Sequence, residues 1–298
     1  MNYELFLETI KNCLQVQLGD EYEIQIGNAP KNNRSDYKVL GIFRLSPAGN
    51  RISRAVGLEE IYQKYKAGRT IEDCVKDLVE IYRKEEPEAK NLIDIAEELN
   101  NWESARERLY PMLVSREGNE KLFEGLVHRP FLNLEIIYYL EVDVNETKGN
   151  IKVSNAMSRR WKRSEQELYS QAMENLEKDR YELISVRELV EEMMGSAANV
   201  DDEVCLYVLL SEREYYGAAG VLNKEVLKMC EEKVGNSFYL LPSSVHEWMV
   251  VPDNGHYLPE ELKVMVMEVN REQVVPEERL ADAVYYYQEK SGEVQLAV

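Results

Sequence analysis

One apolar segment, residues 134–144, constrains the fold of this chain more than any other. It reads LEIIYYLEVDV, and through its middle apolar side chains fall on both alternating faces. A strand of this kind has to be covered on both sides, so we expect it to lie in the centre of its sheet. Residues 145–149 form a turn that leads to an expected partner strand at 151–153.

Elsewhere, helical periodicity and short β-type runs both occur, and together they predict an α+β protein. The N-terminal part contains an opening helix that carries Phe6, Ile10 and Leu14 on one face. Further expected elements are strands at 21–27, 37–45 and 51–56, helices beginning at Leu58 and Thr70, and another helix separated from these by Pro87.

In the C-terminal half, serine and asparagine caps or a first-turn proline mark the helix starts. Helices are expected after Ser164, Ser185, Asn223 and at Pro259, and strands at 203–210, 238–241, 245–250 and 282–288. The inward side of the helix from Pro259 is expected to carry Leu262, Met265, Val266 and Val269.

A polar segment near residues 115–119 suggests a domain boundary. We therefore expect a smaller, helix-rich α+β domain at 1–115. The second domain, 116–298, is expected to hold a mixed sheet flanked by helices, and to carry the Pro-Ser-Ser-Val-His-Glu block at 242–247.

The net charge of −19, from 55 acidic and 36 basic side chains, limits the classes of partner. A surface of this sign repels phosphate backbones and anionic lipids, so we expect neither a nucleic-acid nor a membrane partner. No segment approaches the roughly 20 apolar residues of a membrane span. The first residues also lack the pattern of a signal peptide, which favours a cytoplasmic location.

The four cysteines lie far apart in the sequence at apolar positions: Cys13, Cys74, Cys205 and Cys230. There is no Cys-x-x-Cys pair, so we expect no structural zinc site, and four reduced, buried thiols.

The block around His246 permits two interpretations. In the first, Ser243 or Ser244 acts with His246 and Glu247 as a hydrolase site, helped by a carboxylate such as Glu268 or Asp282. No Gly-x-Ser-x-Gly elbow surrounds either serine. In the second, 242–244 is a turn between strands, and His246 donates a hydrogen bond to a backbone carbonyl.

Two other ligand sites can be considered. A metal could use His246 with Glu247, His256, Glu268 or His128, but no His-Glu-x-x-His helix or repeated ligand spacing occurs, so we predict no metal and no cofactor. The small residues of 216–220 occupy a position typical of phosphate loops, but the lysine and fingerprint glycines are missing. Close packing between a helix and a strand is the simpler role for this segment.

A basic patch at 158–163 contains Arg159, Arg160 and Trp161. It could contact an acidic partner or an RNA end. Alternatively, the two arginines lie at a helix C-terminus, where cations are favoured by the helix dipole, and Trp161 packs inward.

Five stretches resemble a large uncharacterised "domain of unknown function" family of Gram-positive gut anaerobes, and more distantly another uncharacterised bacterial family. They are RPFLNLEIIYYL (129–140), YGAA (216–219), FYLLPSSVHE (238–247), MEVN (267–270) and LADAVY (280–285). The resemblance implies a cytoplasmic bacterial protein without an assigned activity. It also directs attention to the polar members of these apolar blocks, which must find partners: His246, Glu247, Asn270 and Asp282.

No complete catalytic constellation is present in the sequence. We therefore expect a non-enzymatic binding or regulatory module that acts on a protein or small-molecule partner. The alternative is a hydrolase-type enzyme that uses the segment from Ser243 to Glu247 with a nearby carboxylate.

Overall fold

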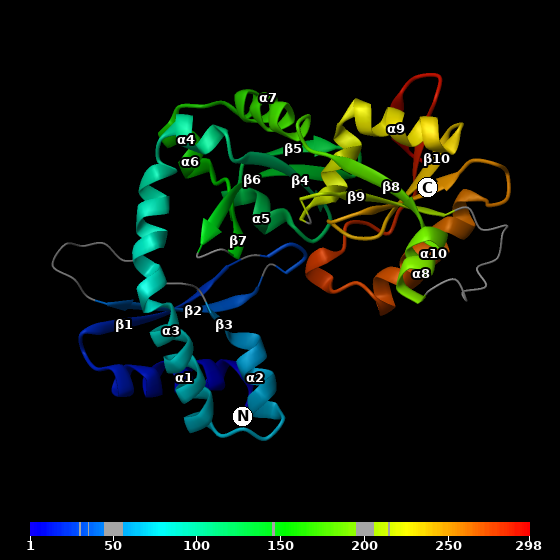
Figure 1. Ribbon diagram of the computed structural model, residues 1–298. Helices are drawn as coiled ribbons and strands as arrows, with labels where there is room; N and C mark the ends of the chain where they lie inside the picture. Colours follow the sequence, from blue (N-terminus) through cyan, green and yellow to red (C-terminus); the bar gives the residue numbers. More distant parts are fainter. Residues whose placement is uncertain (30, 35, 45–55, 145–146, 195–205, 214) are drawn as a thin grey trace. The chain divides into compact units, whose positions relative to one another are not determined.

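The structure, a computed structural model, describes residues 1–29, 31–34, 36–44, 56–144, 147–194, 206–213 and 215–298 (Figure 1). Contacts divide the chain into two compact units, one formed by 1–101 with 142–149 and the other by 102–141 with 150–298. Helices and antiparallel sheets occur along the chain, which confirms the α+β class.

The first unit packs helices against one face of an antiparallel sheet. Ile24 and Ile26 face Ile42 and Leu40 across the β1–β2 pairing, and these side chains join the core formed with the three helices. Asn2 caps the first helix through its side chain, as Thr70 does the third. The elements are α1 (Tyr3–Leu18), β1 (Tyr22–Asn28), β2 (Lys38–Arg44), β3 (Val56–Gly57), α2 (Leu58–Lys66) and α3 (Ile71–Glu98).

Two expectations for this unit need comment. The helix break at Pro87 is wrong, because α3 continues through that residue. Proline removes one helical hydrogen bond, but the surrounding glutamates, lysines and alanine are strong helix formers. The strand expected at 51–56 lies outside the described residues except for Val56, which belongs to β3.

A long central strand organises the start of the second unit. β4 and β5 pair with β6 in the order β4-β6-β5, and β7 also pairs with β6, so the expected central position is confirmed. The second unit begins at Trp102 by contacts, and β4 pairs with β6 along its full length. The elements of this part of the chain, of which 142–149 counts with the first unit, are α4 (Trp102–Arg106), β4 (Leu109–Ser115), α5 (Glu120–Gly125), β5 (His128–Phe131), β6 (Leu134–Val144), β7 (Thr147–Lys152), α6 (Asn155–Trp161) and α7 (Glu165–Leu176).

The later part of this unit contains a six-stranded sheet in the order β13-β12-β10-β11-β9-β8. A mixed sheet was expected, but these pairings are antiparallel. The reason is that short connections such as the β10–β11 and β12–β13 hairpins cannot join parallel neighbours. The elements are β8 (Tyr181–Ser185), α8 (Val186–Met194), β9 (Tyr207–Ser211), η1 (Gly217–Leu222), α9 (Lys224–Val234), β10 (Phe238–Pro242), β11 (Trp248–Pro252), α10 (Pro259–Glu272), η2 (Pro276–Glu278), β12 (Tyr285–Gln288) and β13 (Glu293–Leu296).

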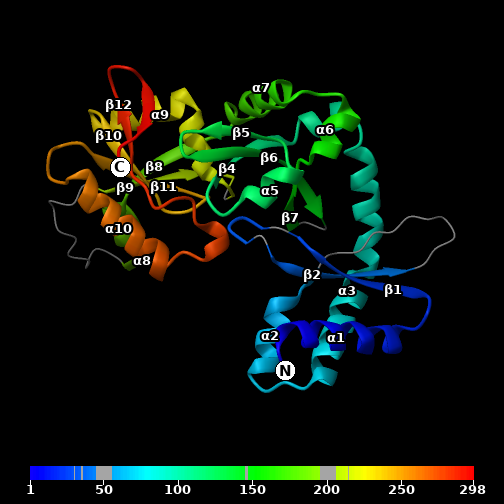
Figure 2. The same ribbon diagram turned by 180° about the vertical axis from the view of Figure 1, so that it is seen from behind.

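The two faces of this sheet are covered by different helices. α10 packs on the face that carries Leu241 and Val251 (Figure 2). On the other face, the Trp248 indole N–H donates to the Ala218 carbonyl of η1 at 2.7 Å, and Tyr287 donates to Glu231 of α9 at 2.6 Å. The segment between α10 and β12 returns beside α10, and this return positions the candidate site described next.

Candidate functional site

The inward side of α10 ends in a polar residue. Leu262, Val266 and Asn270 follow one another at intervals of four residues, and all three are buried. Met265 and Val269, which we expected to be inward, are each 37% exposed. The buried stripe is therefore narrower than predicted, and Asn270 occupies its last position.

Asn270 is only 3% exposed, and one side of its amide is fixed by the returning chain. Its Nδ2 donates to the Ala281 carbonyl at 3.0 Å and to Asp282 Oδ1 at 2.7 Å. These two acceptors also settle the orientation of the amide, since a flipped group would place oxygen against oxygen. The sequence analysis named Asn270 and Asp282 separately, and the structure brings them into contact.

The other side of the Asn270 amide lacks a partner. Its Oδ1 is buried, and no hydrogen-bond donor reaches it among the described residues. A buried acceptor left in this state costs about 1–3 kcal/mol, so such groups are rare and call for an explanation.

Asn270 borders an open cleft of about 450 Å³ between α10 and the returning segment. A second cleft, of about 430 Å³, lies beside it, and Asp282 lines both. The first is lined by Val264, Met267, Glu268, Asn270, Arg271, Arg279 and Asp282. The second is lined by Ser115, Arg116, Glu117, Glu120, Asn133, Ala281 and Asp282.

Most of the first cleft's lining was not identified from the sequence. Val264 and Met267 lie three residues apart on the side of α10 away from Leu262, and they are 56% and 48% exposed. Two apolar residues on an otherwise polar helix face were the available signal. Arg279 gave none, because it comes from the irregular segment after η2.

His246 lies in the turn between β10 and β11, and its hydrogen-bond partners differ from those expected of a catalytic histidine. Its Nδ1 accepts the backbone N–H of Tyr216 at 3.1 Å, and its Nε2 lies 3.7 Å from Glu278 Oε1. Its ring also stacks on Tyr216. The bond to a backbone group was expected, but the imidazole accepts from N–H where we predicted donation to a carbonyl. With Nδ1 acting as an acceptor, the neutral ring carries its proton on Nε2.

The two serines of this turn bond elsewhere. Ser244 Oγ accepts the backbone N–H of His246 at 3.0 Å, and Ser243 Oγ donates to Glu247 Oε1 at 3.0 Å. Each hydroxyl thus stabilises the turn. Asp282 and Glu268, the carboxylates proposed to assist, line the α10 cleft instead.

The segment 216–220 packs tightly under the same turn. Gly217 to Val221 are buried in η1, and a Cβ on Gly217 would lie 2.4 Å from the His246 carbonyl oxygen. Tyr216 has a φ of 55°, which is uncommon for a residue with a side chain. This segment holds the β10–β11 turn in place, the packing role considered for it above.

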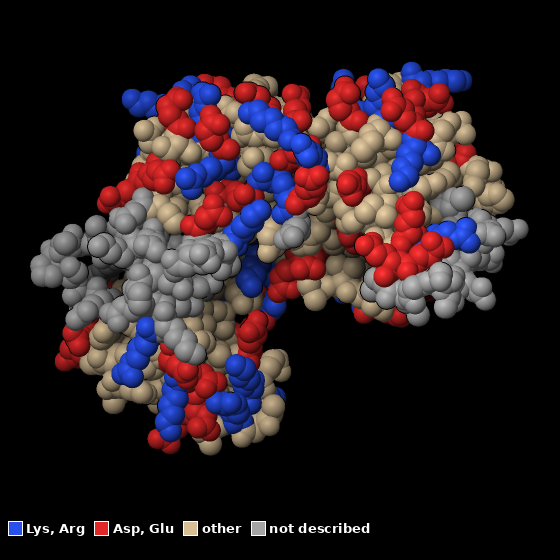
Figure 3. Space-filling view, in the orientation of Figure 1, with Lys and Arg blue, Asp and Glu red and all other residues tan. Residues whose placement is uncertain are grey.

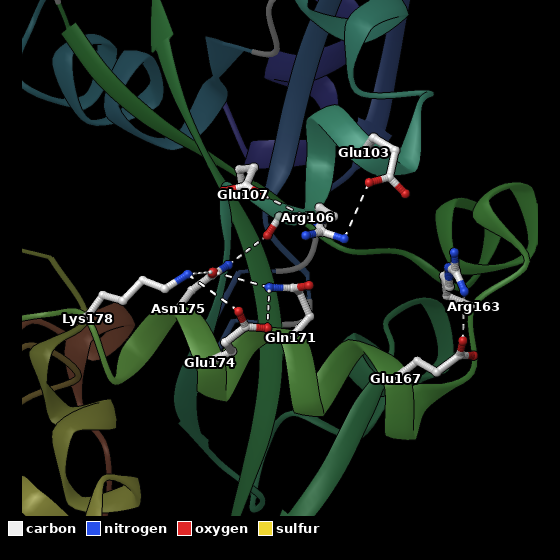
Figure 4. Close-up of polar contacts among 9 residues, drawn as sticks. All are labelled: Glu103, Arg106, Glu107, Arg163, Glu167, Gln171, Glu174, Asn175 and Lys178. Atoms are coloured by element: carbon white, nitrogen blue, oxygen red, sulfur yellow. Dashed lines mark hydrogen bonds and ion pairs between the residues drawn. The ribbon is translucent and has the colours of Figure 1, made fainter.

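The basic patch is divided between solvent and core. Arg159 and Arg160 are exposed in the last turn of α6, and Trp161 is buried with its ring 5.7 Å from that of Trp102. Nearby, Arg163 pairs with Glu167 at 2.9 Å (Figure 4). These positions fit the helix-terminus interpretation of the patch.

A partly buried charge cluster was missed from the sequence. Arg213 pairs with Glu141 and with Asp179, and its guanidinium lies 3.5 Å from the ring centre of Tyr110. Burial raises the pKa of Asp179 to about 6, against the opposing effect of Arg213. Its members come from four separate segments, so no local pattern could have revealed it.

The three histidines occupy separate places. His128 contacts Glu135 at 3.0 Å, and His256 lies in the exposed loop before α10. No group of three or more potential metal-ligating side chains occurs in the described part of the chain. Within the same residues, no helix is both long enough and apolar enough to cross a membrane. On the face in Figure 3, basic and acidic side chains are interspersed.

The fold is that of an α+β protein whose second unit carries an open cleft lined by polar and apolar side chains. The chain belongs to a family of unknown function, DUF5688, which it matches over residues 3–289. No curated protein and no solved structure matched the chain.

Proposed function

We propose that this chain is a non-enzymatic binding or regulatory module, and that its second unit binds a small-molecule ligand in the cleft beside Asn270. The observation that carries the proposal is the buried Asn270 Oδ1 that lacks a donor at the wall of an open cleft. A ligand with an N–H or O–H group would complete this hydrogen bond. Binding would then remove the free-energy cost of the unpaired acceptor. The cleft volume lies within the range of small-molecule sites.

A second buried asparagine in the same unit shows how such an amide is completed without a ligand. Asn175, 2% exposed on α7, also donates to two backbone carbonyls, those of Arg106 and Leu109. Its Oδ1 accepts from Gln171 and from Lys178, both at 3.3 Å (Figure 4).

The corresponding positions on α10 offer no such donor. Four residues before Asn270 stands Val266, which is apolar, and Gln273, three residues after, makes no hydrogen bond to Asn270 Oδ1. The vacant acceptor is therefore specific to the cleft, and is not a general property of buried asparagines in this fold.

The hydrolase alternative gains no support from the geometry. Its nucleophile candidates bond to the turn, and the Nδ1 lone pair of His246 is occupied by a backbone N–H. A general base needs a free lone pair directed at the nucleophile. The proposal also includes a bacterial, cytoplasmic setting, which the family resemblance implies, and it excludes nucleic acid as a partner on the basis of the net charge of −19.

Thermal-shift screening of the full chain against small polar metabolites tests the proposal, followed by calorimetric titration of any compound that raises the Tm. Met267→Trp fills the cleft and is expected to abolish the response. Met265→Trp is the matched control, because Met265 is also exposed on α10 but does not line the cleft. Failure of every compound, or an unchanged response in Met267→Trp, would contradict the proposal.

A further inference from the structure

The charges of the Asn270 cleft restrict the ligand further. In a chain with an excess of acidic residues, this cleft holds two acidic and two basic side chains, Glu268 and Asp282 against Arg271 and Arg279. A site that recognises an anion or a cation alone concentrates one sign of charge. Balanced charges around a cleft suit a ligand that carries both.

Two oxygen acceptors belong to the hydrogen-bonded pair of Asn270 and Asp282. Asp282 Oδ1 accepts from Asn270 Nδ2 at 2.7 Å, and the Asp282 carboxylate is exposed. Asn270 Oδ1, which no donor reaches among the described residues, is the second acceptor of this pair. An ammonium group carries three donors and no acceptor, so it can satisfy both.

Guanidinium groups supply the opposite charge. Arg279 is held by its Nε, which donates to the Val274 carbonyl at 3.0 Å. Among the described residues, the ion-pair partner of Arg271 is Glu272, at 2.9 Å, and both side chains are well exposed. An exposed pair of this kind is weak, so Arg271 can exchange it for a ligand carboxylate, which the guanidinium fork binds well.

Val264 and Met267 also line the cleft and give it an apolar surface. We infer that, provided the cleft is the binding site proposed above, its ligand is a zwitterion with an apolar side chain, namely an α-amino acid, free or in a short peptide. The ammonium group contacts Asn270 and Asp282, the carboxylate contacts Arg271, and the side chain covers Val264 and Met267.

Calorimetric titration of the wild-type chain with leucine, N-acetyl-leucine and leucinamide tests the charge requirement. Leucine should bind, and each analogue, which lacks one charge, should bind at least about tenfold more weakly through loss of a charge-assisted contact. Equal binding of either analogue would overturn the inference. Leucyl-leucine identifies the source: tighter binding than leucine indicates a peptide that extends toward the second cleft.

Two charge variants locate the contacts. Arg271→Gln should weaken leucine binding about tenfold, and Lys263→Gln on the same helix, outside the cleft, should leave it unchanged. Asp282→Asn keeps an acceptor for Asn270 but removes the negative charge, so it should weaken leucine more than N-acetyl-leucine. If a compound of another class binds and Met267→Trp abolishes that binding, the proposed function stands and the amino-acid inference is wrong. If nothing binds, both are wrong.

Discussion

Asp179 is a carboxyl group placed where its charge is poorly solvated. Burial raises its pKa from the ordinary 3.8 to about 6. Between these values the folded chain holds a proton that the unfolded chain has lost. Protonation of Asp179 therefore contributes to the stability of the folded state, and this contribution is fully present below about pH 4. It declines as the pH rises through about 6.

The prediction concerns the difference in unfolding free energy between wild type and Asp179→Asn. From pH 4 to pH 7 this difference should shift by about 2 kcal/mol, with the wild type losing stability relative to the variant. Urea unfolding at several pH values measures it. A constant difference would contradict the raised pKa.

His246 is expected to matter for folding more than for chemistry. His246→Ala leaves the backbone N–H of Tyr216 without its acceptor and should cost about 1–3 kcal/mol. Glu247→Ala loses the bond from the Ser243 hydroxyl and should cost less than about 1 kcal/mol. Thermal melts compare the two. An unchanged Tm for His246→Ala would indicate that the residue is maintained for another role.

At the residue scale, sequence reasoning succeeded where a polar residue interrupts an apolar block. Asn270 and Asp282 were selected on that ground, and they meet in the cleft. Arg279 could not be selected, since its position depends on how the chain returns after α10. The partners of His246 were also hidden, because Tyr216 and Glu278 lie about thirty residues away on either side.

Among the elements, η1 packs closely against the β10–β11 turn. A Cβ at Gly217 would lie 2.4 Å from a backbone oxygen, which cannot move aside as a flexible side chain can. Gly217→Ala should therefore destabilise the chain by about 1–3 kcal/mol. Gly125→Ala is the control, because no atom lies within 4 Å of its added methyl group and alanine favours the helical end of α5. Chemical denaturation should separate the two variants, and equal stability would contradict the packing.

Elements with a strong local signal were predictable from the sequence. The capping box of Ser164 and Glu167 begins α7 as expected, and Asn223 caps α9 through its side chain. The helix break predicted at Pro87 was wrong because the free-energy cost of proline in a helix was considered without the helix-forming residues around it. The prediction of a mixed sheet was also wrong. Whether two strands pair in parallel or antiparallel depends on the connections between them and not on the strands themselves.

On the scale of the whole molecule, the thiols provide a test of compartment and folding together. Cys74 and Cys230 are buried and free, Cys13 is half-buried and free, and Cys205 lies outside the described residues. Burial raises the pKa of Cys230 to about 12, so little reactive thiolate forms there. Denatured protein without reductant should show four free thiols, and in native protein Cys13 should be alkylated before Cys230. A count of two thiols would contradict this.

The tryptophans have a consequence for any optical study of this chain. All three, Trp102, Trp161 and Trp248, belong to the second unit, and the first unit contains tyrosine but no tryptophan. Trp248 is fully buried with its indole bonded to η1. Tryptophan fluorescence therefore reports on the second unit alone. Comparison with circular dichroism, to which both units contribute, would reveal whether they unfold together or in separate steps.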